Sequence, residues 1–95
     1  MRVVWTRIAL AHLDEIQDYI AQDSPTAAYH VALELTEGAN KLLSANPMIG
    51  RLGRARGTRE LIFDGLPYIV AYRVTDQVEI LAIVHTARQW PESFD

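Results

Sequence analysis

The chain has 95 residues, of which 49% are hydrophobic and 22% are charged. This composition is typical of a globular protein and excludes a disordered chain, and we expect one domain over residues 1–95 because so short a chain has room for one core. Nine Lys and Arg residues against twelve Asp and Glu residues give a net charge of −3, which argues against binding to nucleic acid through bulk charge alone.

The first half of the chain predicts a strand followed by two helices. Residues 2–6 are rich in β-branched and aromatic side chains, which are typical of a short strand. The first helix is indicated by apolar residues that recur with helical spacing, namely Ala9, Leu13, Ile16 and Ile20. Ser24 and Pro25 are typical of a helix N-cap and first turn, so a second helix is expected from there to about Ser44.

The second half predicts a loop from Met48 to Gly57 and then three strands, Thr58–Phe63, Pro67–Val74 and Gln77–Thr86. The connections between these strands are short and turn-forming, which indicates an antiparallel meander. We therefore expect an α+β fold, in the order β-α-α-β-β-β. Its N-terminal strand, antiparallel helical hairpin and three-stranded antiparallel meander would place the helices over one face of a four-stranded sheet.

Several kinds of site are excluded by the residues present. The chain has no cysteine, which excludes disulfides and thiolate chemistry. His12, His30 and His85 lack the spacing of metal ligands, and the glycine-rich loop matches no nucleotide-binding motif, so we expect no metal and no cofactor. There is no apolar run of signal-peptide or membrane-spanning length, which favours a soluble cytoplasmic protein without membrane contact.

The cations are concentrated in the second half of the chain. Residues 51–88 contain six arginines against four carboxylates, whereas residues 1–50 contain three cations against six carboxylates. Glycines lie among the arginines of the loop, so backbone N–H groups could approach an anion there. A solvated loop that keeps the protein soluble is the alternative interpretation. The candidate contact residues of this segment are Arg51, Arg54, Arg56 and Arg59.

Strand alternation and turn length predict where two further basic residues lie. With a turn of two or three residues between the first two meander strands, Arg73 lies opposite residues 56–57, beside the arginine-rich loop. His85 would lie at the other end of the sheet, opposite residues 66–67. We therefore do not expect all the basic groups in one constellation, and His85 fits a structural histidine better than a general base.

Four segments together resemble the RelE/ParE superfamily of bacterial toxins, and the resemblance is closer to its ParE-like members. The segments are Gly50-Arg51, Thr58–Leu61, Pro67–Val74 and His85–Pro91. The resemblance covers nearly the whole chain and implies the toxin half of a type II toxin–antitoxin pair. It also implies growth inhibition, plasmid stabilisation and a hetero-oligomer with a cognate antitoxin, either ParD-like or RelB-like.

The superfamily contains two mechanisms, and the resemblance helps to choose between them. RelE-like members cleave mRNA in the ribosome, while ParE-like members inhibit DNA gyrase. RelE uses lysines, arginines and a tyrosine, and Arg88 is the only one of these five groups that this chain keeps. The other four corresponding positions hold Glu60, Ile62, Ile69 and Phe94.

We therefore expect a ParE-like toxin that acts on DNA gyrase by binding and is not an enzyme. Its target-binding residues would be Arg51, Arg54, Arg56, Arg59, Arg73, Arg88 and Trp90. Two alternatives remain open. One is a RelE-like, ribosome-dependent mRNA endonuclease that uses Arg88 and His85, and the other is a non-toxic remnant that only binds an antitoxin.

Overall fold

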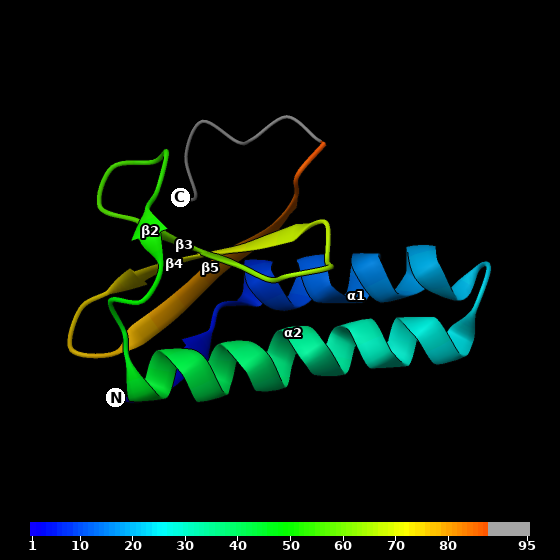
Figure 1. Ribbon diagram of the computed structural model, residues 1–95, viewed down its shortest axis with the longest axis horizontal. Helices are drawn as coiled ribbons and strands as arrows, with labels where there is room; N and C mark the ends of the chain where they lie inside the picture. The colour runs from blue at the N-terminus through cyan, green and yellow to red at the C-terminus, as the bar shows by residue number, and fades with distance from the viewer. Residues whose placement is uncertain (88–95) are drawn as a thin grey trace.

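The computed structural model describes residues 1–87, which form a strand, two helices and four further strands (Figure 1). The α+β class and the order of the main elements agree with the expectation from the sequence. The elements are β1 (Val3–Trp5), α1 (Arg7–Ala21), α2 (Pro25–Ala45), β2 (Arg51–Leu52), β3 (Arg59–Ile62), β4 (Tyr68–Val74) and β5 (Val78–His85).

Both helices begin at a side chain that caps their first turn. The hydroxyl oxygen of Thr6 accepts a hydrogen bond from the Ala9 N–H at 3.2 Å, and that of Ser24 accepts one from the Ala27 N–H at 3.1 Å. Each bond satisfies an N–H group that has no partner within its helix. The predicted cap at Ser24 is therefore confirmed. Neither helix is long and apolar enough to cross a membrane, within residues 1–87.

The sheet has five strands in the order β1-β5-β4-β3-β2, one more than expected from the sequence. β1 pairs parallel with β5, and the other neighbours are antiparallel. The additional strand is β2, which lies in the segment expected to be a loop and pairs with β3. Two paired residues are too few to show strand alternation in a sequence, which is why the pattern gave no sign of β2.

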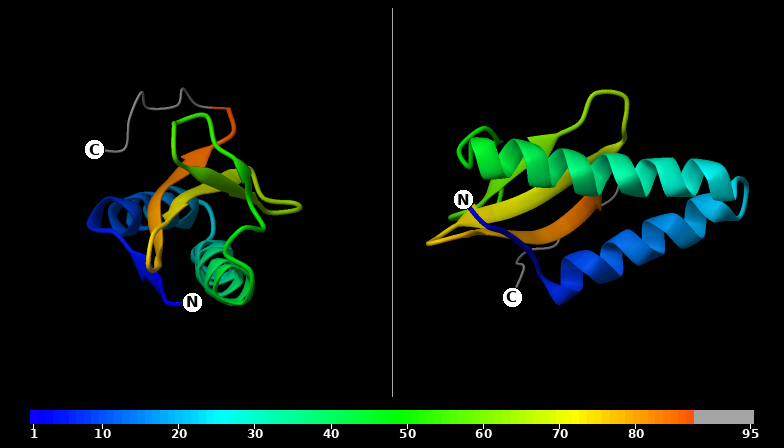
Figure 2. Two further views of the ribbon diagram at one scale, coloured as in Figure 1. Left: turned by 90° about the vertical axis from the view of Figure 1, so that its left-hand side faces the viewer. Right: turned by 90° about the horizontal axis from the view of Figure 1, so that it is seen from below.

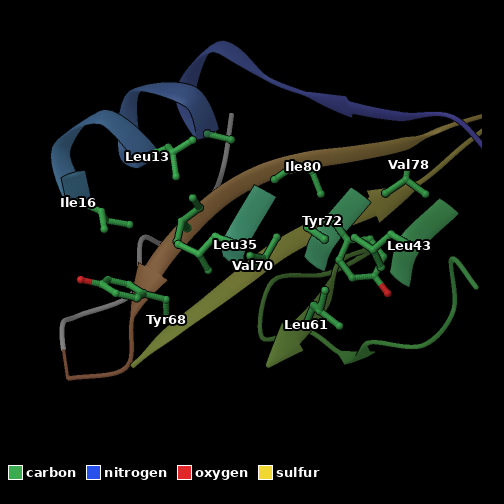
Figure 3. Packing of buried hydrophobic residues seen from close by; sticks show 13 residues of the cluster. Leu13, Ile16, Leu35, Leu43, Leu61, Tyr68, Val70, Tyr72, Val78 and Ile80 are labelled. Carbon is green, nitrogen blue, oxygen red and sulfur yellow. The ribbon is translucent and has the colours of Figure 1, made fainter. Parts of the chain in front are cut away.

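The helical hairpin covers one face of the sheet, and the core lies between these two layers (Figure 2). Leu13 and Ile16 of α1 pack there with Leu35 and Leu43 of α2 (Figure 3). The strands contribute alternate residues to this face, as expected for side chains of period two. The buried strand residues of the core are Leu61, Tyr68, Val70, Tyr72, Val78, Ile80 and Ile83.

The predicted strand register is wrong in both strand pairs of the meander, β3 with β4 and β4 with β5. Arg59 pairs with Tyr72, so Arg73 falls next to Thr58 rather than opposite residues 56–57, because the connection from β3 to β4 spans residues 63–67. His85 pairs with Tyr68 rather than with residues 66–67. A bulge between the pairs of Ala71 and Tyr72 adds Leu81 to β5 and shifts the ladder by one residue.

The junction between β1 and α1 ties the start of the chain to β5. The Thr6 hydroxyl donates to the carbonyl oxygen of Ile80 at 2.7 Å, and the Thr6 N–H donates to the same oxygen at 3.1 Å. Beyond this point β1 has ended, and Nδ1 of His12 accepts the Ile83 N–H at 3.2 Å. At the edge of β5, a side chain of α1 therefore accepts a backbone hydrogen bond at a position that β1 does not reach.

We expect Thr6→Ala to lower the free energy of unfolding by about 1–2 kcal/mol, because it removes both the helix cap and the bond to Ile80. Chemical denaturation followed by circular dichroism measures this loss. Thr26→Ala is a matched control, since Thr26 is exposed in the first turn of α2. Equal stability of the two variants would contradict the double role of Thr6.

Candidate functional site

β2 and β3 form a hairpin that brings four arginines into one part of the molecule. Arg51 pairs with Glu60 and Leu52 with Arg59, and the Gly53 N–H donates to the Thr58 carbonyl at 2.8 Å. We call residues 50–60 the arginine hairpin. It projects from the sheet on the side away from the helices (Figures 1 and 2).

The tip of the arginine hairpin carries its two most peripheral arginines. Arg54 and Arg56 are both exposed, and they flank Ala55. Gly57 follows with φ of +77°, a left-handed conformation that glycine adopts without steric cost. The Thr58 hydroxyl closes the turn by donating to the Ala55 carbonyl at 2.5 Å. The tip is thus a defined turn on which Arg54 and Arg56 are exposed residues.

Tyr72 anchors the segment that leads into the arginine hairpin. Its side chain lies in the core, yet its hydroxyl donates to the Pro47 carbonyl and accepts from the Gly50 N–H, both at 2.8 Å (Figure 3 shows Tyr72 beside Leu43 and Leu61). A Cβ atom at position 50 would lie 2.6 Å from this hydroxyl oxygen. Glycine is therefore required at position 50 by the close approach of Tyr72.

The surroundings of Tyr72 favour the protonated phenol. Burial raises the pKa of its hydroxyl above the ordinary value of 10.0, because the phenolate would be poorly solvated in the core. The hydrogen bond from Gly50 and the charge of Arg59 lower the pKa, but by less than burial raises it. The hydroxyl therefore keeps the proton that it donates to Pro47.

Glu60 is the second anchor of the arginine hairpin. Only 2% of its side chain is exposed, and its two carboxylate oxygens have separate donors. Oε1 accepts from Nε of Arg51 at 3.0 Å and lies 2.9 Å from the same guanidinium's terminal nitrogen, while Oε2 accepts from the Arg54 N–H at 2.9 Å. A buried charge is tolerated only when it is paired and hydrogen-bonded in this way.

The four loop arginines predicted as contact residues lie together but differ in their surroundings. Arg59 donates to the Gly50 carbonyl at 2.8 Å and is half-buried, and Arg51 is held by Glu60 with 52% of its side chain exposed. Arg54 and Arg56 remain exposed at the tip. The first two arginines thus also stabilise the hairpin, and the last two form its outer surface.

The other predicted site residues are not part of the arginine hairpin. Arg73 of β4 forms an ion pair with Glu79 of β5, with 2.5 Å between Nε and Oε1. His85 lies at the Tyr68 end of β4, where the two rings stand edge to face with centroids 5.4 Å apart, and its Nδ1 accepts the Ala87 N–H at 3.0 Å. Arg88 and Trp90 lie outside the described residues.

Sequence reasoning missed the two residues that hold the arginine hairpin in place. The sequence places Glu60 at a position that corresponds to a lysine of RelE and Tyr72 in the strand Pro67–Val74, and neither assignment predicts an anchoring role. The sequence does contain a signal for Glu60, since it is the single carboxylate among the residues from Gly50 to Phe63. Tyr72 has no such signal, because only the fold brings Pro47 and Gly50 to its hydroxyl.

We expect the contribution of the Tyr72 hydroxyl to stability to depend on pH. Because its pKa is raised in the folded state, the contribution is complete below pH 10.0 and is lost as the pH rises through the folded-state pKa. Tyr72→Phe should cost about 1–3 kcal/mol of unfolding free energy at pH 7, since it leaves Gly50 and Pro47 without their partner. The difference between the two proteins should narrow above pH 10.0, and denaturation from pH 7 to 11 measures it. A constant difference would contradict the raised pKa.

We expect Glu60→Gln to destabilise the protein by about 1–3 kcal/mol, because the amide cannot replace the charge-assisted bond to Arg51. Urea denaturation checks the loss. Glu79→Gln is the matched control, since it also removes an ion pair between neighbouring strands but lies nearer the surface. A loss for Glu60→Gln no larger than for the control would mean that the buried carboxylate is not an anchor.

Comparison with known proteins identifies the family. Residues 3–90 match the family described as ParE toxin of type II toxin-antitoxin system, parDE. Toxin RelE2 of Caulobacter vibrioides is 47% identical over 88 residues, which cover 92% of this chain and 97% of RelE2. Y4kP of Sinorhizobium fredii, provisionally named a toxin, is 43% identical over 91 residues, which cover 96% of this chain and 94% of Y4kP.

A solved structure, the chromosomal ParDE TA system from P. aeruginosa, contains a chain with the same fold. It superimposes with a TM-score of 0.80 at 32% sequence identity, and the match covers 90% of this chain and 95% of that chain. The strand, helical hairpin and sheet described above are thus shared over nearly the full length. The chain therefore belongs to the ParE toxin family of type II toxin–antitoxin systems, within the RelE/ParE superfamily.

Proposed function

We propose that this toxin inhibits DNA gyrase by binding, with the arginine hairpin as its target-contact surface, and that a ParD-like antitoxin neutralises it. The match to the ParE family and the likeness to a chain of the P. aeruginosa ParDE system support this assignment. The main observation in support of this contact surface is the projecting hairpin tip. There Arg54 and Arg56 are exposed on a turn that Glu60 and Thr58 hold in place.

The chemistry of the arginine hairpin favours binding over bond cleavage. Cleavage by a ribose hydroxyl needs groups that move protons beside cations that stabilise the developing charge. The carboxylate of the hairpin, Glu60, is buried and occupied by Arg51 and by the Arg54 N–H. Arginine itself stays protonated and cannot act as a base. The arginine hairpin therefore supplies positive charge but no group suited to transfer a proton.

A rigid arginine surface suits recognition of an acidic protein or of phosphate groups. Guanidinium groups bind carboxylates and phosphates through paired hydrogen bonds, and a fixed turn loses little conformational entropy on binding. Arg54 and Arg56 would make the direct contacts. Arg51 and Arg59 would hold the hairpin in place and add positive charge. Arg73 would contribute less to target binding, because it forms an ion pair with Glu79. Arg88 and Trp90 remain candidates from the sequence.

The alternative function is ribosome-dependent cleavage of mRNA, and one observation favours it. Toxin RelE2 of Caulobacter vibrioides is 47% identical to this chain and has a name from the RelE-like branch. Such an enzyme would have to use Arg88 and His85. In the structure His85 packs against Tyr68 and accepts the Ala87 N–H, which are contacts of the kind that a structural histidine makes.

Controlled expression in a bacterium without antitoxin separates these functions. Inhibition of gyrase should produce a DNA-damage response and trapped gyrase–DNA complexes while transcripts stay intact. Discrete cuts in ribosome-bound transcripts would instead identify the endonuclease, and normal growth would identify the non-toxic remnant.

Purified toxin should also melt at a higher temperature with saturating antitoxin, since binding only to the folded state stabilises it.

We expect Arg54→Glu and Arg56→Glu each to lower toxicity at least about tenfold, the loss typical of one central charged contact of about 1.4 kcal/mol. Both residues are exposed, so the melting temperature should stay within about 2–4 °C of the original. Arg7→Glu is the matched control, because Arg7 is exposed on the helical layer. Full toxicity of both hairpin variants would overturn the assignment of the contact surface.

A further inference from the structure

The helical layer carries only negative formal charge over most of its length. Residues 8–40 include most of α1 and α2, and they contain six carboxylates but no Lys or Arg. All six of these residues are exposed, and two of them, Asp14 and Asp18, are neighbours one turn apart on α1. A surface of one sign favours contact with a surface of the opposite sign. The six residues are Asp14, Glu15, Asp18, Asp23, Glu34 and Glu37.

The turn between α1 and α2 lies at the opposite end of the molecule from the arginine hairpin. Figure 1, viewed with the longest axis horizontal, shows this turn on the right and β2 with its loop on the left, and the second view in Figure 2 agrees. We call residues 14–34, which flank the turn, the acidic helical end. The longest axis extends over 38 Å, so the two ends cannot meet within one molecule.

The most exposed large apolar side chains divide between these two ends. Within residues 1–87 the three largest exposed fractions are 78% for Leu52, in the arginine hairpin, and 62% for Tyr19 and 61% for Tyr29, both in the acidic helical end. The faces of tyrosine rings attract guanidinium groups, and exposed apolar surface beside charged groups is typical of protein contacts. Each end thus combines charge with apolar surface that could pack against the other.

We propose that the arginine hairpin of one molecule binds the acidic helical end of a second copy of this chain, so that the free toxin associates head to tail. The guanidinium groups of Arg54 and Arg56 would form paired hydrogen bonds with carboxylates such as that of Asp18 and would stack on an exposed tyrosine. Each pairing leaves one arginine hairpin and one acidic helical end unoccupied. The association therefore continues beyond the dimer, as a ring or an open chain of molecules.

Head-to-tail association would have a consequence for toxicity. It would cover Arg54 and Arg56, which we assign to target binding, so that associated molecules would be inactive until they dissociate. This consequence rests on the proposed function, whereas the association itself requires only the two surfaces. Nucleic acid is repelled by the acidic helical end and could not replace the second copy there.

The first test measures the mass of the purified full chain by sedimentation equilibrium. The weight-average mass should rise above that of one chain as the protein concentration increases from about 10 μM to about 1 mM, the range of weak protein contacts. Raising the ionic strength from about 0.05 M to about 0.5 M should weaken the association at least about tenfold, because salt screens pairs of exposed charges. Association that is equal or stronger at high salt would mean that apolar surface alone drives it, and would contradict the proposal.

The second test neutralises part of the acidic helical end and leaves the arginine hairpin unaltered. Asp14→Asn combined with Asp18→Asn should weaken the association at least about tenfold, since both residues are exposed in the acidic helical end. The matched control is Asp64→Asn combined with Asp76→Asn, which makes the same change of charge at exposed residues in the strand connections. The control should associate within about twofold of the unaltered protein.

The arginine hairpin is tested in the same way. Arg54→Gln combined with Arg56→Gln should weaken the association at least about tenfold. Arg2→Gln combined with Arg7→Gln, a matched change at two other exposed arginines, should stay within about twofold. Of the two weakened variants, one keeps its arginine hairpin and the other keeps its acidic helical end. Mixed in equal amounts, they should form a complex of two chains that grows no further.

Three further results would also overturn the proposal. They are a chain that stays monomeric up to about 1 mM at low salt, undiminished association when Asp14 and Asp18 are both replaced, and a mixture of the two weakened variants that forms no complex. Every readout is self-association of the purified chain, and the change at Asp14 and Asp18 leaves the arginine hairpin intact. Failure of this proposal would therefore leave the assignment of gyrase as the target unaffected, and a chain that associates without being toxic would contradict only the proposed function.

Discussion

The Tyr72 hydroxyl connects the core of this protein to the surface that we assign to its function. The ring is packed between the helices and the sheet, so its position is fixed by the core, and its oxygen bonds to both Pro47 and Gly50. The chain leaving α2 is thereby placed next to β3. Without this bridge the segment would still be held to β3 by the β2–β3 pairs, by Glu60 and by Arg59, but it would lose its tie to the core. The orientation of the exposed arginines therefore depends on a buried phenol.

Glu60 gives the arginine hairpin its specific form. A carboxylate buried to 2% exposure must be compensated locally, and Arg51 with the Arg54 N–H provides this compensation. One acidic residue thus orders a segment that would otherwise hold four mutually repelling cations. The net charge of −3 does not show this local arrangement. Within the arginine hairpin the charge is positive, and its one carboxylate is buried.

The fold could be predicted from the sequence because its elements carry strong local patterns. Helical apolar spacing, the cap at Ser24 and the strand composition of residues 67–74 each depend on neighbours in the chain, and each is present in the structure. The register could not be predicted, because it depends on the length of the β3–β4 connection and on an additional residue at Leu81, and neither changes the apolar pattern. The anchors of the hairpin depend on contacts between residues 6 to 25 positions apart, and no local pattern shows these.

The parallel pairing of β1 with β5 has a consequence for the synthesis of the protein. The bond of Thr6 to Ile80 joins residues 74 positions apart, and β5 also lies between β1 and β4 in the sheet. While the ribosome has not yet released β5, β1 has no strand to pair with, and α1 lacks the strand on which it packs. The first elements to be synthesised therefore cannot reach their final arrangement until β5 has left the ribosome. Folding of the sheet is thus delayed relative to the synthesis of its first strand and of the helical hairpin.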